Sequence, residues 1–258
     1  MRIFLLFLFL APLAKAHPVI YKDGFVYWGE FSSQENTQIL SYTFHPNFAL
    51  QLSSDFEKYT GGGSNKSVTY QLGLNVLIKR WFLENSQANI YTSFQSGVFT
   101  DEISGIYKDG KRTKFPIKDR LTFQWNLSAD WESRFIYTAG GIKLKGRSSS
   151  INEALWGDFY YRIGFAPYIA GMDTLQTWFV LMFQASAAGT VNKDMRDYFL
   201  KEHKEREFPY RTSLITDNLA VGINWKITPL LRFFYKNVLW EIGSSLQSDF
   251  YLTLMLHY

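Results

Sequence analysis

The sequence has no cysteine and, beyond its first residues, no long apolar run. None of the 258 residues is cysteine, which excludes both disulfide bridges and thiolate metal ligands. After the N-terminal run, no segment reaches the ~18 consecutive apolar residues typical of a transmembrane helix. Helical spans are therefore excluded, and a chain of this kind can cross a membrane only with strands.

Motifs of known enzymes are also missing. The chain has four histidines, His17, His45, His203 and His257. It contains no Gly-x-Ser-x-Gly elbow, no His-Glu-x-x-His pair and no glycine-rich phosphate loop. We therefore predict that the protein is not an enzyme. Two alternatives stay open: an outer-membrane lipid-modifying enzyme, and a structural barrel that anchors partners through its loops.

The charge balance excludes another class of partner. Lys and Arg total 27 against 23 Asp and Glu, which gives a net charge of +4. This small excess does not indicate a nucleic-acid-binding protein. The mean hydropathy is only −0.14, although 47% of the residues are hydrophobic and 18% are aromatic. Apolar and polar residues are therefore interleaved along the chain.

The last residues show this interleaving most clearly. One alternating set is apolar and comprises Phe250, Leu252, Leu254, Leu256 and Tyr258. The other set comprises Tyr251, Thr253, Met255 and His257. A period of two predicts a strand with two different faces. The ending resembles the C-terminal signature of outer-membrane β-barrels, which implies contact with the barrel assembly machinery through the strand that ends at Tyr258.

The first residues predict export. Arg2 precedes the apolar run 3–13, and Ala14-Lys15-Ala16 follows as a small-x-small cleavage site. We expect residues 1–16 to form a signal peptide and residues 17–258 to form one domain. In an even-stranded barrel of the Gram-negative outer membrane, both ends of that domain would be periplasmic.

Segments 68–78 and 121–131 alternate in the same way, and their polar faces are mostly small and neutral. Together with the chain ends, they predict an all-β, closed antiparallel transmembrane β-barrel of about 12 strands embedded in outer-membrane lipid. Predicted strands at 22–31, 36–45, 210–227 and 230–241 alternate short turns with long polar connections; one short turn falls at Thr228-Pro229. Removing the strand 22–31 and a neighbour gives a ten-stranded alternative.

The polar faces provide candidates for a lumen that passes a small solute. These lumen-lining candidates are Gln71, Asn75, Gln124, Asn126, Asp158, Arg162 and Asn218. Among them, Asp158 and Arg162 lie four positions apart on one strand, and we expect them to form a structural charge pair. The class of function predicted is a porin-like small-solute channel or a metal-associated outer-membrane protein.

The histidines suggest a metal site. In the predicted topology, His17, His45 and His257 gather at the periplasmic mouth, and Met255 shares the lumenal face of His257. Imidazole and an N-terminal amine suit Cu(II), and a thioether suits Cu(I). The alternative is that His45 only supports a His-Pro-Asn turn. No cofactor is required by the sequence, and copper is the one candidate.

Three stretches, 17–24, 162–168 and 227–245, resemble those of an uncharacterised proteobacterial outer-membrane β-barrel family. Genes of that family tend to lie near heavy-metal, especially copper, handling genes. The resemblance implies an outer-membrane location and a metal-resistance context. It supplies no binding or catalytic residues, and the connection 190–210 is longer here than the family leads us to expect.

Overall fold

The computed structural model of the protein describes residues 22–32, 35–59, 65–102, 104–108, 111–114, 121–148, 153–168, 174–190, 212–216, 219–246 and 249–258. The predicted signal peptide, His17 and Asn218 lie outside these residues. In this part of the chain, every regular element is a strand. No helix among these residues is long and apolar enough to cross a membrane.

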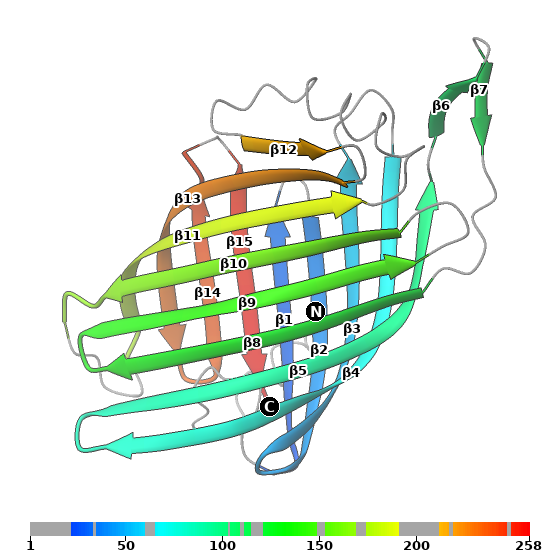
Figure 1. The fold of residues 1–258 in the computed structure, drawn as a ribbon. Coiled ribbons are helices and arrows are strands. Elements are labelled where there is room, and N and C mark those ends of the chain that lie inside the picture. The colour runs from blue at the N-terminus through cyan, green and yellow to red at the C-terminus, as the bar shows by residue number, and fades with distance from the viewer. Residues whose placement is uncertain are drawn as a thin grey trace, which may run out of the picture.

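The strands form a closed barrel (Figure 1). Their bounds are β1 (Gly24–Ser32), β2 (Glu35–His45), β3 (Phe48–Tyr59), β4 (Asn65–Leu83), β5 (Ser86–Glu102), β6 (Ser104–Lys108), β7 (Lys111–Lys114), β8 (Leu121–Ser133), β9 (Ile136–Ser148), β10 (Glu153–Phe165), β11 (Gln176–Thr190), β12 (Thr212–Thr216), β13 (Leu219–Tyr235), β14 (Val238–Ser244) and β15 (Phe250–His257).

Closure involves the first and last strands of the chain. β1 pairs antiparallel with β15, from Val26 opposite His257 to Ser32 opposite Tyr251. β11 pairs with β13, and this pairing completes the ring of neighbours. Of the described strands, β6 and β7 form a separate hairpin, and β12 pairs with the first part of β13. The wall therefore has the predicted 12 antiparallel strands, including the first strand.

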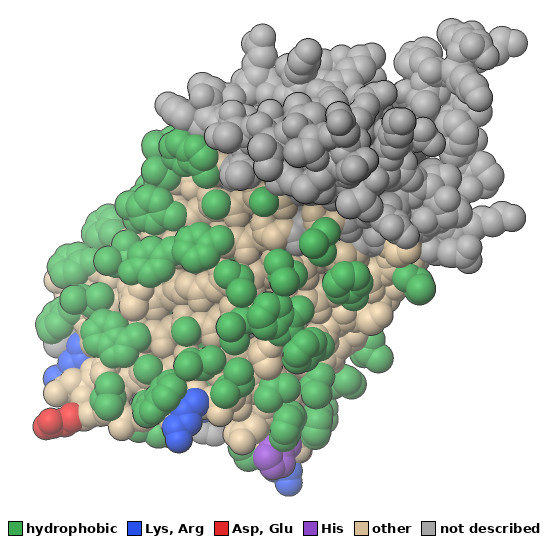
Figure 2. All heavy atoms as spheres, in the orientation of Figure 1, with side chains coloured by type: hydrophobic (Ala, Val, Ile, Leu, Met, Phe, Trp, Pro, Cys, Tyr) green, Lys and Arg blue, Asp and Glu red, His purple; other side chains and the backbone are tan. Residues whose placement is uncertain are grey.

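Side chains alternate between the two sides of the wall. On β4, Leu72 is 56% exposed whereas the neighbouring Gln71 is 2% exposed. On β8, Phe123 points outward and the adjacent Thr122 is buried. Figure 2 shows hydrophobic side chains across the visible outer face, with charged side chains at its lower edge. A wall that is apolar outside and polar inside is the arrangement that lipid requires of a spanning barrel.

The two ends of the barrel differ in their connections. Two-residue turns join β2 to β3, β4 to β5, β8 to β9 and β13 to β14, and β15 ends beside them. We call this the turn end. The connections at the opposite end are mostly longer and include residues 103–120, which carry β6 and β7, and residues 191–218, which carry β12. This alternation matches the prediction.

One predicted turn is wrong. Thr228 and Pro229 lie inside β13, and the turn is formed by Lys236 and Asn237 instead. The Ile227 carbonyl accepts a hydrogen bond from the Leu246 amide, on the side of β13 that faces β14. Backbone groups two residues apart on a strand point the same way, so the backbone of Pro229 also faces β14. The pairing of β13 with β14 begins only at Leu230, one residue after Pro229. The missing proline N–H therefore falls where the ladder ends, which is where a strand tolerates proline.

Aromatic side chains gather at the turn end of the outer wall. Trp81 and Tyr168 are exposed there, and Phe82 is 76% exposed. Trp240 stacks against Phe233 with ring centroids 5.5 Å apart. Amphipathic rings are favoured at the lipid–water interface, so this belt marks one boundary of the apolar wall.

Inside, the turn end is packed with buried side chains, of which some are apolar and others, such as Asn89 and His257, are polar. Three buried clusters lie there, centred on Trp178 and Met182, on Leu77 and Tyr91, and on Leu239 with Met255. We call these clusters together the floor. Narrow barrels are filled by side chains in this way.

Candidate functional site

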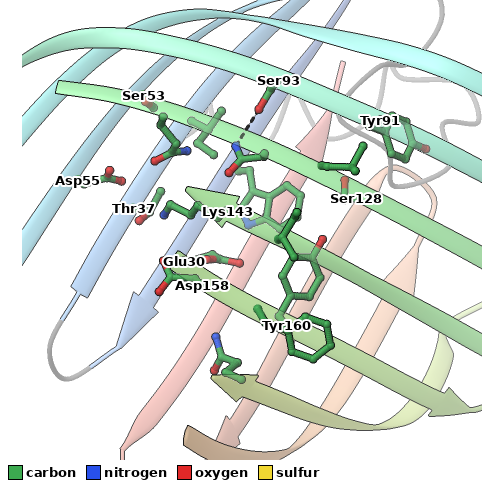
Figure 3. Close-up of a pocket in the computed structure, with 18 of the residues that line it drawn as sticks. Glu30, Thr37, Ser53, Asp55, Tyr91, Ser93, Ser128, Lys143, Asp158 and Tyr160 are labelled. Carbon is green, nitrogen blue, oxygen red and sulfur yellow. Dashed lines mark hydrogen bonds between the residues drawn. The ribbon is translucent and has the colours of Figure 1, made fainter. Parts of the chain in front are cut away.

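A cavity of about 490 Å³ lies in the polar part of the interior (Figure 3). Its charged lining residues are Glu30, Glu35, Asp55, Lys143, Asp158, Arg162, Lys226 and Asp249. The aromatic side chains of Trp28, Tyr137 and Tyr160 also line it. These groups come from six strands, β1, β2, β3, β9, β10 and β13, and from the connection before β15. Those on strands reach the cavity because inward and outward positions alternate along the wall.

Lys143 has a central place in this cavity. Its side chain comes from β9 and extends between Asp55 on one side and Glu30 and Asp158 on the other (Figure 3). Those three carboxylates, with Glu35, act on the amine electrostatically. Among the described residues, Lys143 has no hydrogen bond and no ion pair within 4 Å.

The carboxylates around Lys143 have other contacts. Asp158 accepts a hydrogen bond of 2.6 Å from the Ser186 hydroxyl. Asp55 forms an ion pair of 3.6 Å with Lys145. Glu30 accepts from the Tyr251 hydroxyl at 3.0 Å. One such contact occupies part of a carboxylate's capacity, since two oxygens offer about four acceptor positions.

A second charged group lies between the cavity and the turn end. Glu241 is fully buried and accepts from Arg162 at 3.0 Å and from Arg232 at 2.6 Å. Arg162 also donates to the Tyr251 hydroxyl at 2.8 Å, and its guanidinium lies 3.7 Å from Glu30. We call Arg162, Arg232 and Glu241 the arginine–glutamate cluster. It ties β10, β13 and β14 together across the interior.

The expected pair between Asp158 and Arg162 is therefore wrong. Both side chains line the cavity, but Asp158 bonds Ser186 and Arg162 bonds Glu241. The reason is geometric, because four residues of a strand span ~13 Å at about 3.3 Å each. Closer partners across the barrel satisfy each group.

The other lumen candidates within the described residues also face the interior. Asn75, Gln124 and Asn126 line the cavity, and Asn126 donates to the Ser93 hydroxyl at 2.7 Å. Gln71 is buried and lies 3.5 Å from the Thr122 hydroxyl. Asn218 is outside the described residues. The structure thus groups five of the seven candidates, Asp158 and Arg162 included, around one cavity.

Several buried polar atoms in this lining have no hydrogen-bond partner among the described residues. They are Trp28 Nε1, Asn75 Nδ2, Gln124 Oε1, Arg162 Nε and Gln184 Oε1. Buried polar groups in proteins are nearly always hydrogen-bonded. These atoms lie in the wall around the cavity and are covered by neighbouring groups, so the charged side chains of the lining are the groups that a polar molecule would meet.

The predicted metal ligands are placed differently from one another. His257 is buried, and its Nε2 lies 2.9 Å from Met255 Sδ. His45 is exposed and its Nδ1 accepts from the Asn47 amide at 3.2 Å, as in the turn alternative. His17 lies outside the described residues. Within those residues, no group of three or more His, Cys, Asp or Glu side chains could hold a metal ion.

Sequence reasoning missed Glu30, Lys143, Arg232 and Glu241. Each occupies an inward position of a strand, and a charged residue at an inward position was the available signal. Arg232 and Glu241 are directly opposite each other across β13 and β14. That relation was hidden because the turn between these strands had been predicted at Pro229.

The fold and the cavity together define a class. A closed 12-stranded antiparallel wall with lipid-compatible side chains outside and a polar, charged cavity inside is a transmembrane β-barrel.

No protein-family model matches the sequence, and no curated protein matches it. Among solved structures, the chain is similar to KdgM porin in complex with disordered oligogalacturonate, with 10% identity, a TM-score of 0.39 and coverage of 91% of this chain and 98% of that one. It is also similar to a loop-deletion mutant of OmpT, an outer membrane protein of Vibrio cholerae, with 6% identity, a TM-score of 0.33 and coverage of 91% and 97%. A third similar structure is the outer membrane protease OmpT from Escherichia coli, with 6% identity, a TM-score of 0.25 and coverage of 91% of this chain and 95% of that one. Similarity this slight says nothing about function.

Proposed function

We propose that the protein is an outer-membrane β-barrel of a Gram-negative bacterium and that it conducts small polar solutes. The observation that supports this proposal is the charged cavity enclosed by a wall whose outside is apolar. A purely structural barrel has no need of charged side chains of both signs around an internal cavity. The signal peptide predicted at residues 1–16 is consistent with this location.

The floor sets the expected size of the current. Because buried apolar clusters and buried polar side chains pack together inside the turn end, we expect a narrow path there and no wide-pore conductance. The cavity supplies selectivity, and the floor limits the flow.

Planar-bilayer conductance of the folded, leader-free protein tests the proposal. We expect small, discrete current steps. Asp158→Asn removes a lining charge and should shift the ion selectivity toward anions. Glu84→Gln, in an exposed turn, is the control and should leave selectivity unchanged. Silent bilayers containing protein of verified fold would contradict a channel and favour a binding, enzymatic or structural role.

A second candidate function is copper association, and the contact between His257 and Met255 favours it. An imidazole nitrogen beside a thioether is a donor pair suited to Cu(I). Calorimetric titration of the leader-free protein with Cu(I) should give saturable binding that Met255→Leu and His257→Ala abolish. His45→Ala is the control. Equal affinity in all four proteins would rule out this site.

A further inference from the structure

We propose that the cavity binds a small zwitterionic solute, a molecule with one cationic and one anionic group such as an amino acid or a short peptide. This inference rests on the proposed solute channel and names its substrate class. Lys143 is the feature that carries it, together with the carboxylates that face its amine across the cavity.

The first argument concerns the charge of Lys143, which has no direct ion-pair partner among the described residues. Three other cations nearby have direct partners, since Arg162 and Arg232 bind Glu241 and Lys145 pairs with Asp55. Lys226 also lines the cavity and, within the described part of the chain, forms no ion pair within 4 Å. Lys143 has none among the described residues, although it projects into the cavity lining. An ammonium group removed from bulk water is stabilised by an anionic oxygen at hydrogen-bond distance. A ligand carboxylate can supply that oxygen.

The second step concerns the opposite charge. Glu30 and Asp158 lie together on one side of Lys143, and Asp55 lies on the other (Figure 3). Each accepts at least one contact from the protein and keeps further acceptor capacity. A ligand ammonium beside one of these carboxylates would complete a second charged contact a short distance from the first.

Other solute classes fit less well. The described lining holds five carboxylates and three cationic side chains, so a purely anionic solute is repelled. A purely cationic solute must lie beside Lys143, which faces the same space. A neutral solute leaves the charge of Lys143 without a partner. Only a zwitterion satisfies both signs.

The test uses four small probes that differ mainly in charge. They are glycylglycine (zwitterion), N-acetylglycine (anion), glycinamide (cation) and N-acetylglycinamide (neutral). Binding to the detergent-folded protein is measured by isothermal titration calorimetry, and permeation is measured by swelling of proteoliposomes. We expect glycylglycine to bind about tenfold more tightly than each other probe, because it alone makes both charge-assisted contacts.

Variants assign the two contacts. Lys143→Met should lower glycylglycine affinity about tenfold and make glycinamide the better ligand. Asp158→Asn should lower the affinity for glycylglycine and glycinamide and spare N-acetylglycine. Lys79→Met, an exposed position near the turn end, is the matched control. Folding of each variant is verified by circular dichroism and by the difference in gel mobility between heated and unheated samples. If Lys143→Met does not fold, Lys143→Gln replaces it.

The two proposals fail separately. Proteoliposomes that exclude all four probes would refute the channel, while calorimetry would still report the preferred class. Equal affinities across the probes, a preference for the neutral or cationic probe in the unaltered protein, or an unchanged profile in the Lys143 variant would overturn the zwitterion site.

Discussion

Glu241→Gln should destabilise the barrel more than any single change of a surface charge. Glu241 is 0% exposed and is the shared anion of two buried guanidinium groups. The substitution keeps the size of the side chain and removes only its charge. Arg162 and Arg232 would then repel each other in a site with little access to water.

The magnitude follows from the geometry. Removing one member of a buried ion pair typically costs about 3–5 kcal/mol. Two contacts reduce the loss here, since Glu30 stays 3.7 Å from Arg162 and the Tyr137 ring lies 4.0 Å beneath Arg232. A glutamine oxygen can also still accept a hydrogen bond. We therefore expect the lower end, about 3 kcal/mol, or a roughly hundredfold change in the folding equilibrium.

Urea unfolding of the protein folded in lipid vesicles measures this loss, with the fluorescence of the 8 tryptophans as the signal. Glu84→Gln is the matched control and should change the free energy of unfolding by less than about 0.5 kcal/mol. The double variant Glu241→Gln/Arg232→Gln should recover part of the stability because it removes one of the two unpaired cations. A loss of unfolding free energy below about 1 kcal/mol for Glu241→Gln would refute this account of the arginine–glutamate cluster. A double variant less stable than the single variant would refute it as well.

Two further predictions concern the wall. A Cβ at Gly97 would collide with the backbone carbonyl of Tyr70 on β4, so Gly97→Ala should cost about 1–3 kcal/mol in the same unfolding assay; Gly157→Ala, where the nearest contact is Leu144 Cδ2 at 3.5 Å, should be tolerated, and equal losses would contradict the close approach. Leu72→Arg places a charge on the exposed outer face of β4 and should cost about 2–4 kcal/mol in bilayers, whereas Phe82→Arg at the aromatic belt should cost about 0–1 kcal/mol. The opposite order would contradict the membrane position of the wall.

The wall was predictable from sequence because its signal is local. Each strand must present one face to lipid and the other to the interior, so the alternation is written into every segment, as in Phe250 to Tyr258. The strand number and the two kinds of connection follow from counting such segments. One proline was enough to mislead, because Pro229 is a stronger turn signal than Lys236-Asn237, although the backbone of Lys236 has a positive φ (52°).

The site was predictable only in part because its partners are distant in sequence. Alternation places Asn75, Gln124 and Asp158 on inward faces, and this is enough to nominate them. It cannot say which inward charges meet across the barrel. Arg162 and Glu241 are 79 positions apart, and Tyr251 and Glu30 are 221 apart. Such pairings depend on barrel closure and shear, which no short window of sequence contains.

The seam between β1 and β15 has a consequence for the timing of assembly. Its seven paired positions join the start of the folded chain to its end, and the entropy cost of bringing segments so far apart together rises with the logarithm of their separation. The seam therefore forms only after β15 has been delivered to the membrane. Until then, both strands are open sheet edges that can recruit other chains. Delivery to the membrane must be faster than aggregation at these edges, or a carrier must cover them.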